Sequence, residues 1–234
     1  LCITASEKNK GELWVGTDDG NVQLTRDGGT NWTNLSPLIK GLPKGAWIPQ
    51  ITLGTNAGEA WVVVNNYRQG DRSPYLFYTA DYGKSWMNKV SAMQVNGHCL
   101  SVVQDAQQPK LVFLGTEHGL YVSFDYGSSW MKWTHGYPSV ATQDLKIHPR
   151  ENDLVIGTFG RALYVLDNIE PLRLYAAFGE KAFEPKLSAM PSPTAFISAW
   201  QQPAGERFPA DTYFAGENKQ TRGQLCYYFN VDKK

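Results

Sequence analysis

The sequence predicts an all-β fold, and more narrowly a partial β-propeller of about 3.5 four-stranded blades. The first observation is a pattern, Ser/Thr-x-Asp-x-Gly-x-x-Trp, that occurs three times, at 25–32, 79–86 and 123–130. Its aspartates lie 54 and 44 residues apart, close to the period of a propeller blade. The second observation is composition: 8 Trp, 12 Tyr and 10 Phe accompany 22 Gly and 13 Pro, which is typical of short strands joined by tight turns.

The repeat units divide into expected strands in chain order. The units cover 11–32, 59–86, 110–130 and, with a degraded end, 153–168. Innermost strands are expected at 48–53, 98–104 and 143–148. In the third unit the second strand, which ends in Gly-Thr, covers 111–116, and the third covers 121–124. A fourth strand begins at each motif tryptophan, and only 172–183 has a helical pattern.

The repeated motif is expected to form the turn between the third and fourth strands. Its members are Thr25, Asp27, Gly29, Trp32, Thr79, Asp81, Gly83, Trp86, Ser123, Asp125, Gly127 and Trp130. The carboxylate would accept hydrogen bonds from the turn's backbone N–H groups, the hydroxyl would tie its far side, and glycine would supply a positive φ. The tryptophan would drop between neighbouring sheets. These residues are therefore predicted to be structural rather than catalytic.

The three motifs resemble Asp-boxes, also called BNR repeats. The stretches 157–173 and 208–229 resemble the end of the propeller and the start of the next domain in large bacterial proteins of the sortilin-like (VPS10) or "glycosyl hydrolase, BNR repeat" kind. That resemblance implies a secreted, periplasmic or cell-surface protein. The blade count, about three full units and one partial unit, is too small for a closed propeller. We therefore expect a fragment whose propeller is completed by the remainder of the same protein, by a partner chain or by a second copy.

Three regions are expected along the chain. Residues 1–170 would form the propeller blades, and 171–194, which contains several prolines, would form a linker or arm. Residues 195–234 would start an Ig- or fibronectin-like sandwich, with a strand at 195–200 and a hairpin within 212–231.

Composition and motifs exclude several function classes. Lys and Arg number 22, as do Asp and Glu, so bulk charge indicates no nucleic-acid partner. No apolar run is long enough to span a bilayer. Three cysteines and four histidines show no zinc spacing, and no phosphate-binding glycine loop occurs, so no metal or cofactor is expected.

The candidate ligand-binding residues follow the Gly-Thr strands. Asp18, Asp19, Glu117 and His118 occupy equivalent repeat positions, so they could ring one propeller face. Trp47 and Tyr67 are among the aromatic residues outside the motif that could stack on a sugar or grip a peptide. For an inverting glycoside hydrolase, the candidate carboxylates are Asp18, Asp19, Glu59, Asp71, Glu117 and Asp144.

We assign no catalytic residue from the sequence. The preferred interpretation is a non-catalytic binding or scaffold module that holds a protein or glycan ligand. The alternative is part of a glycoside hydrolase acting on polysaccharide, with its carboxylates partly outside this chain. Two facing carboxylates in an open groove lined by Trp or Tyr would favour the hydrolase.

Overall fold

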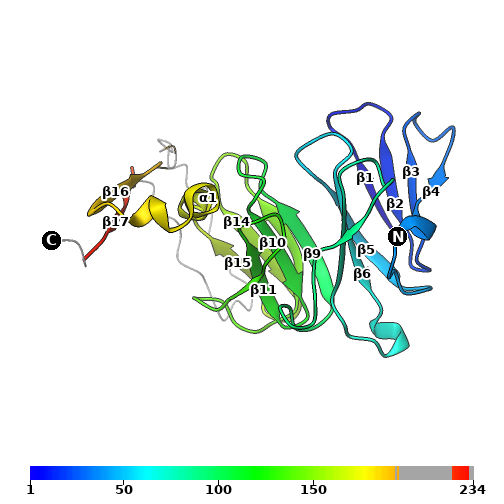
Figure 1. Cartoon of the computed structure of the whole chain (residues 1–234). Helices are drawn as coiled ribbons and strands as arrows, with labels where there is room; N and C mark the ends of the chain where they lie inside the picture. The colour runs from blue at the N-terminus through cyan, green and yellow to red at the C-terminus, as the bar shows by residue number, and fades with distance from the viewer. Residues whose placement is uncertain (193, 195–222, 232–234) are drawn as a thin grey trace, which may run out of the picture. The chain divides into compact units, whose positions relative to one another are not determined.

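The computed structural model describes residues 1–192, 194 and 223–231, and the chain forms two compact units, Leu1–Ala182 and Phe183–Lys234 (Figure 1). The larger unit contains four antiparallel sheets, which we call blades 1 to 4. Within each blade the strands lie side by side in chain order, so each strand pairs with the one before it.

The first three blades have four strands each, and blade 4 has three. Blade 1 contains β1 (Cys2–Ala5), β2 (Leu13–Gly16), β3 (Val22–Thr25) and β4 (Thr33–Asn34). Blade 2 contains β5 (Trp47–Leu53), β6 (Ala60–Asn65), β7 (Tyr75–Thr79) and β8 (Met87–Asn88). Blade 3 contains β9 (Cys99–Gln104), β10 (Val112–Thr116), β11 (Gly119–Ser123) and β12 (Met131–Trp133). Blade 4 contains β13 (Thr142–Ile147), β14 (Leu154–Thr158) and β15 (Leu163–Leu166). The predicted partial propeller is confirmed, and each fourth strand begins one residue after the motif tryptophan.

Strand register makes the blades directly comparable. The first residue of the second strand faces the last residue of the third in every blade, and the pairs are Leu13–Thr25, Ala60–Thr79, Val112–Ser123 and Leu154–Leu166. Blade 4 thus has leucine where the other blades have the motif hydroxyl. It also lacks the motif aspartate and tryptophan, and among the described residues no fourth strand pairs with β15.

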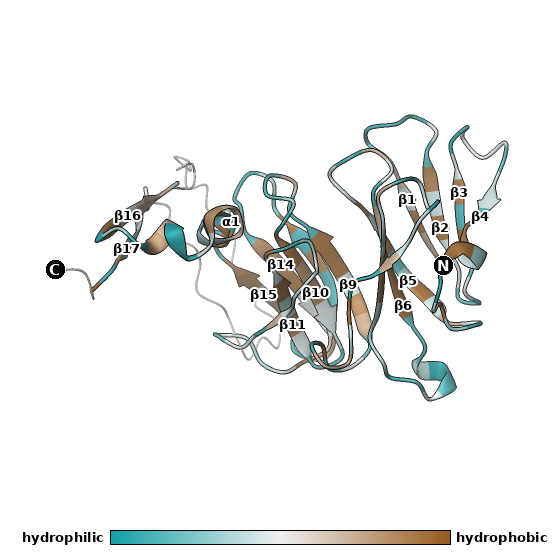
Figure 2. Ribbon diagram, viewed as in Figure 1, coloured by the Kyte–Doolittle hydropathy of each residue, from teal (hydrophilic) through white to brown (hydrophobic). Residues whose placement is uncertain are grey.

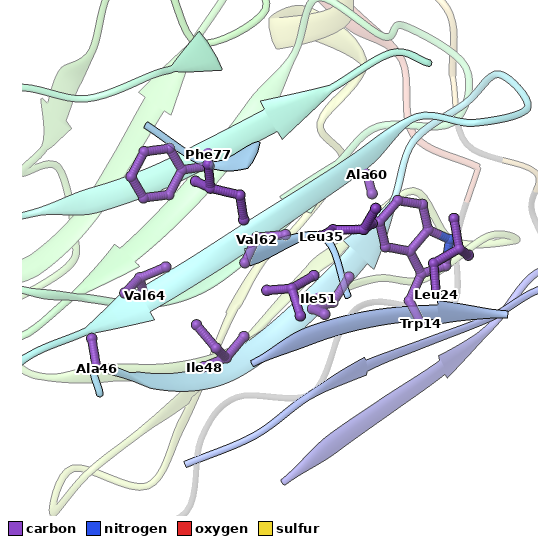
Figure 3. Packing of buried hydrophobic residues seen from close by; sticks show 12 residues of the cluster. Trp14, Leu24, Leu35, Ala46, Ile48, Ile51, Ala60, Val62, Val64 and Phe77 are labelled. Carbon is purple, nitrogen blue, oxygen red and sulfur yellow. The ribbon is translucent and has the colours of Figure 1, made fainter. Parts of the chain in front are cut away.

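Three hydrophobic clusters fill the spaces between neighbouring blades. In the first, Trp14 and Leu24 of blade 1 meet Ile51 and Val62 of blade 2 (Figure 3). The second lies between blades 2 and 3, and the third between blades 3 and 4. The strands are largely hydrophobic and their connections largely hydrophilic (Figure 2), because both faces of an inner blade are covered.

The end of the larger unit differs from the expected boundary near residue 170. Helix α1 (Glu170–Phe178) and the 3-10 helix η3 (Gly179–Phe183) follow blade 4, so the expected helical segment at 172–183 is present. Ile169 and Ala176 are buried in the third cluster, and Arg173 is also buried. Since these side chains pack on blades 3 and 4, the helix belongs to the first unit and not to a linker.

The smaller unit contains one described strand pair. Strand β16 (Leu187–Met190) pairs antiparallel with β17 (Cys226–Phe229), so the expected arm at 171–194 contributes a strand. The expected strand at 195–200 and most of the hairpin within 212–231 lie outside the described residues. In the described part of the chain, no helix is long and apolar enough to cross a membrane.

Candidate functional site

Antiparallel order gives each blade two ends. The loop between the first and second strands and the motif turn lie at one end, which we call the motif end; Gly28 N–H donates to Gly11 O across it. The loop between the second and third strands and the connection to the next blade lie at the other, which we call the ligand end.

The motif turns repeat one hydrogen-bond network at the motif end. In the first turn, Thr25 Oγ1 donates to Asp27 Oδ1 at 2.8 Å and accepts from Gly29 N–H at 3.0 Å. Asn31 N–H donates to Asp27 Oδ1 at 2.9 Å, and this backbone bond is the main reason why the pKa of Asp27 is lowered to about 2. The same contacts recur around Asp81 and Asp125. These carboxylates therefore hold turns together.

Two of the motif tryptophans lie between sheets, as expected, and one does not. Trp86 of blade 2 meets Trp14 of blade 1 edge-on, with ring centroids 6.5 Å apart. Trp130 of blade 3 is buried, and its Nε1 donates to Lys89 O at 2.7 Å. Trp32 of blade 1 is 45% exposed. Among the described residues no sheet lies beside Trp32 on the outer side of blade 1, so for this residue the expectation stays a prediction.

At the ligand end, a glutamate gathers three basic side chains, and we call this set the Glu117 cluster. Arg72 Nη1 lies 2.8 Å from Glu117 Oε1, and His98 Nδ1 lies 3.1 Å from Oε2. His118 Nε2 is 3.8 Å from the same Oε2. The backbone fixes this geometry, since Glu117 N–H donates to His98 O at 3.1 Å. Blade 2 supplies the arginine, and blade 3 supplies the other three residues.

Burial lowers the pKa of His98, although the Glu117 carboxylate opposes this effect; the charges of Arg72 and His118 lower it further. His98 is therefore mainly neutral near pH 7. The Glu117 carboxylate then pairs with the positive charge of Arg72, whose side chain is 68% exposed. A ligand reaching this end meets an exposed guanidinium backed by a half-buried carboxylate.

Aromatic rings lie beside the cluster. Tyr67 stacks on His98 with ring centroids 5.5 Å apart. The guanidinium of Arg68 lies 5.1 Å from the Trp47 ring centroid and 5.9 Å from that of Tyr67. We call Trp47, Tyr67 and Arg68 the aromatic platform. Tyr67 is 44% exposed, so one part of the platform is open to solvent.

The long β6–β7 loop places the platform. The 3-10 helix η2 (Tyr67–Gln69) ends at Gly70, whose φ of 79° is left-handed and favours glycine. Gln69 Nε2 donates to Lys44 O at 2.9 Å and ties the loop to the segment before Trp47. Asp71 accepts from Ser73 N–H, Asn66 and Tyr75, and these bonds lower its pKa to about 2. Asp71 is therefore part of the loop's support.

The four predicted ligand-face residues all lie at the ligand end, but in two separate groups. Glu117 and His118 are brought together in the cluster. Asp18 and Asp19 lie on the β2–β3 turn of blade 1, where Asp19 accepts from Thr17 and Asn21 within its own turn. Those hydrogen bonds lower the pKa of Asp19.

Sequence reasoning missed the participation of Arg72 and His98. They belong to different blades and to no shared motif, so only folding brings them to Glu117. The nearest sequence signal is the composition of the long β6–β7 loop, which contains Tyr67, Arg68 and Arg72 within six residues.

A cavity of about 450 Å³ lies at the motif end, between the first loops of blades 1 and 2 and the end of β9, and Glu12 and Glu59 both line it. Both carboxylates are occupied by neighbours. Glu12 accepts from Trp14 Nε1 at 2.9 Å and from Asn9 Nδ2 at 2.7 Å. Glu59 accepts from Tyr78 OH at 2.9 Å, and neither Trp nor Tyr lines the cavity.

The remaining hydrolase candidates add little to this picture. Burial would raise the pKa of Glu59, but hydrogen bonds from Asn56 and Tyr78 outweigh it and the pKa is lowered. Asp144 lies on β13 and accepts from Leu145 N–H. Within the described residues, no group of three His, Cys, Asp or Glu side chains, the Glu117 cluster included, has an arrangement that could hold a metal ion.

Comparison with known proteins supports the fold. No protein-family model matches the chain. It is 27% identical over 165 residues to the oligoxyloglucan-reducing end-specific xyloglucanase of Emericella nidulans. The aligned region covers 64% of this chain but only 19% of that enzyme.

Solved structures give the same result. The match to the Niastella koreensis GH74 enzyme (TM-score 0.55, 12% identity) covers 71% of this chain and 29% of the enzyme chain. YCF48 bound to D1 peptide (0.50, 17%) covers 67% and 48%. The extracellular domain of the putative one-component system BT4673 from B. thetaiotaomicron (0.52, 14%) covers 71% and 21%. At these identities the likeness shows the propeller fold alone.

Proposed function

We propose that this chain is a non-catalytic, carbohydrate-binding part of a propeller protein, and that the ligand rests on the aromatic platform beside the Glu117 cluster. The observation that carries the proposal is the partly exposed Tyr67 side chain, beside Arg68 and the Glu117 cluster at the end of the sheets. The arrangement joins two blades, so a ligand there would contact loops held by a rigid scaffold.

The chemistry of this end suits a sugar chain. Aromatic rings offer large apolar faces for the C–H surface of a pyranose ring, and a few fixed polar groups orient its hydroxyls. Arg72 can donate to a hydroxyl oxygen while Glu117, 2.8 Å behind it, accepts from another. Because Arg68 lies over Trp47, its guanidinium is held in place before the ligand arrives.

Some of the similar proteins act on glycans, which supports trying a glycan first, although YCF48 is bound to a peptide. The relative is named for its action on oligoxyloglucan, and the similar structures include the Niastella koreensis GH74 enzyme and the GH74 xyloglucanase of Xanthomonas campestris. Similar structures also include extracellular domains of one- and two-component systems from B. thetaiotaomicron. We therefore propose xyloglucan oligosaccharides as the first ligand to try, and a secreted, periplasmic or cell-surface location.

A hydrolase remains the second candidate because of the relative's name and the two carboxylates of the motif-end cavity. A glycoside hydrolase needs a general acid whose pKa is raised. All six carboxyl groups whose pKa is shifted in the described residues have it lowered; they are Asp19, Asp27, Glu59, Asp71, Asp81 and Asp125. None of these six carboxyl groups has the raised pKa of a general acid, and we therefore propose binding without hydrolysis as the first function to test.

Isothermal titration with xyloglucan oligosaccharides tests the proposal. Tyr67→Ala should weaken binding about tenfold, or ~1.4 kcal/mol, as expected for an aromatic contact residue. The matched control is Phe178→Ala, which removes another exposed ring, on α1, and should leave affinity unchanged. Equal affinity in both variants would place the ligand elsewhere. Release of reducing sugar by the wild-type chain, abolished in Glu59→Gln, would favour the hydrolase.

A further inference from the structure

Blades 2 and 3 each pack a matched set of side chains onto the blade before them. Strand register identifies the equivalent positions. In blade 2 they are Ile51, Val62, Phe77 and Trp86, and in blade 3 they are Val102, Leu114, Tyr121 and Trp130. All eight belong to the clusters between blades.

Blade 1 has the same set with no described sheet to cover it. The equivalent residues are Ile3, Val15, Gln23 and Trp32, which we call the head face. Ile3 is 63% exposed and Trp32 is 45% exposed, whereas Ile51 is buried. Three of the four are apolar, so the head face has the composition of an interface between blades.

Blade 4 has the complementary surface. Leu120 and Val122 of blade 3 are buried against blade 4, and their equivalents in blade 4 are Leu163 and Val165. Leu163 is 69% exposed and Val165 is 55% exposed. They lie on one face of blade 4 together with Val155 of β14, which pairs with Val165. We call Val155, Leu163 and Val165 the tail face.

A glycine at the tail face agrees with this assignment. A Cβ on Gly16 would lie 2.5 Å from Ile48 Cγ2 of the next blade, and one on Gly115 would lie 2.5 Å from Thr142 O of the next blade. Gly157 occupies the same register position in blade 4, yet the nearest atom to its Cβ would be Asp144 of its own blade, at 3.6 Å. Gly157 leaves room for a close neighbour, although the position tolerates Val63 in blade 2.

A hydrogen bond between innermost strands also repeats. Thr4 Oγ1 of blade 1 donates to Ile51 O at 2.6 Å, and Thr52 Oγ1 of blade 2 donates to Val102 O at 3.1 Å. The equivalent residue in blade 4 is the exposed Lys146, and the equivalent acceptor on the head face is Ile3 O. An ammonium group can replace the hydroxyl as donor.

We propose that the occupant of the head face is the tail face of a second copy of this chain, and that two copies close one ring of eight blades. The two faces differ, so the contact is head-to-tail, and a twofold axis lets the same contact form twice. The three clusters already present between the four blades serve as the template for it. Closure would also cover exposed apolar faces that otherwise promote aggregation.

Light scattering on a sizing column tests the proposal. The wild-type chain should have twice the 26.2 kDa mass of one copy. Trp32→Glu, in the head face, and Leu163→Glu, in the tail face, should each give a monomer with an unchanged far-ultraviolet circular dichroism spectrum. Met93→Glu is the control, since Met93 is 95% exposed and lies on a loop away from both faces; it should remain dimeric.

Mixing the two monomeric variants separates a lost contact from misfolding. The head face of the Leu163→Glu chain and the tail face of the Trp32→Glu chain are both intact. A mixture should therefore form a heterodimer through one good contact, more weakly than the wild type. A wild-type monomer, or a series of larger species that never closes, would overturn the proposal. So would a Trp32→Glu chain that stays dimeric.

Discussion

Arg173 and Asp105 form a buried ion pair, with 2.7 Å between Nε and Oδ2, that joins helix α1 to the loop after β9. The carboxylate also accepts from the backbone N–H groups of Gln107 and Gln108. Arg173 Nη1 reaches Asn152 at 2.8 Å and also contacts Glu170. An electrostatic contact, as well as packing, therefore holds the helix on blades 3 and 4.

Removing one partner of this pair should be strongly destabilising. Arg173→Met leaves the Asp105 carboxylate buried without its partner charge, which should cost about 3–5 kcal/mol of unfolding free energy. The double variant Arg173→Met with Asp105→Asn removes both charges and should recover part of that loss. Urea denaturation measures both values. An Arg173→Met chain as stable as the wild type would show that the pair contributes no net stability.

The motif aspartates should contribute to stability and not to ligand binding. Asp125→Ala leaves the Ser128 and Ser129 N–H groups without their acceptor, so we expect a loss of about 1–2 kcal/mol, similar to loss of a helix cap. Asp125→Asn keeps one acceptor oxygen and should lose less. Asp18→Ala, at an exposed turn, is the control and should be neutral. Ligand affinity should not change in either Asp125 variant.

The same carboxylate gives a pH dependence. Burial would raise the pKa of Asp125, but hydrogen bonds from Ser129 and Ser123 outweigh it, so the folded-state pKa lies below the ordinary 3.8. The contribution of Asp125 to the free energy of unfolding is therefore complete above the pKa of the unfolded state. It is lost as the pH falls below about 3.8 towards the pKa of the folded state. Urea titrations between pH 5 and pH 2, compared with Asp125→Ala, should converge at the acid end.

His98 should make the chain less stable as pH falls from neutrality. Glu117, Arg72, His118 and the Tyr67 ring face it, and burial dominates by lowering its pKa below 6.5. The unfolded chain then binds a proton before the folded chain does, so stability falls as pH drops through about 6.5 to the lower folded value. Histidine NMR titration measures the pKa. His98→Gln should remove this part of the pH dependence; an unshifted titration would contradict the assignment.

The strands were predictable because each repeat contains residues that mark where its strands end. Gly-Thr marks the end of the second strand and the motif marks the third turn, so β10 and β11 were located within a residue or two. The Glu117 cluster was not, since Arg72 and Glu117 are 45 positions apart and meet only when neighbouring blades pack. That α1 lies in the first unit was not predictable for a related reason: the burial of Ala176 depends on a tertiary contact that no local pattern reveals.

Two glycines in the Gly-Thr strands should respond differently to the same substitution. A Cβ at Gly115 would lie 2.3 Å from Ser101 Oγ and 2.5 Å from Thr142 O, so Gly115→Ala forces blades 3 and 4 apart and should cost about 1–3 kcal/mol. Gly157→Ala meets nothing closer than 3.6 Å, so it should be neutral or slightly stabilising in a single copy. Urea denaturation measures the effect on stability. If two copies close a ring with the close approach that Gly16 and Gly115 show, and not the looser one at Val63, Gly157→Ala should also shift the sizing-column mass towards the monomer, because the added methyl group would meet the blade of the other copy. Gly115 lies at the contact between blades 3 and 4 of one copy, so Gly115→Ala should not change the mass. A mass change seen only with Gly157→Ala would therefore place Gly157 at the contact between copies.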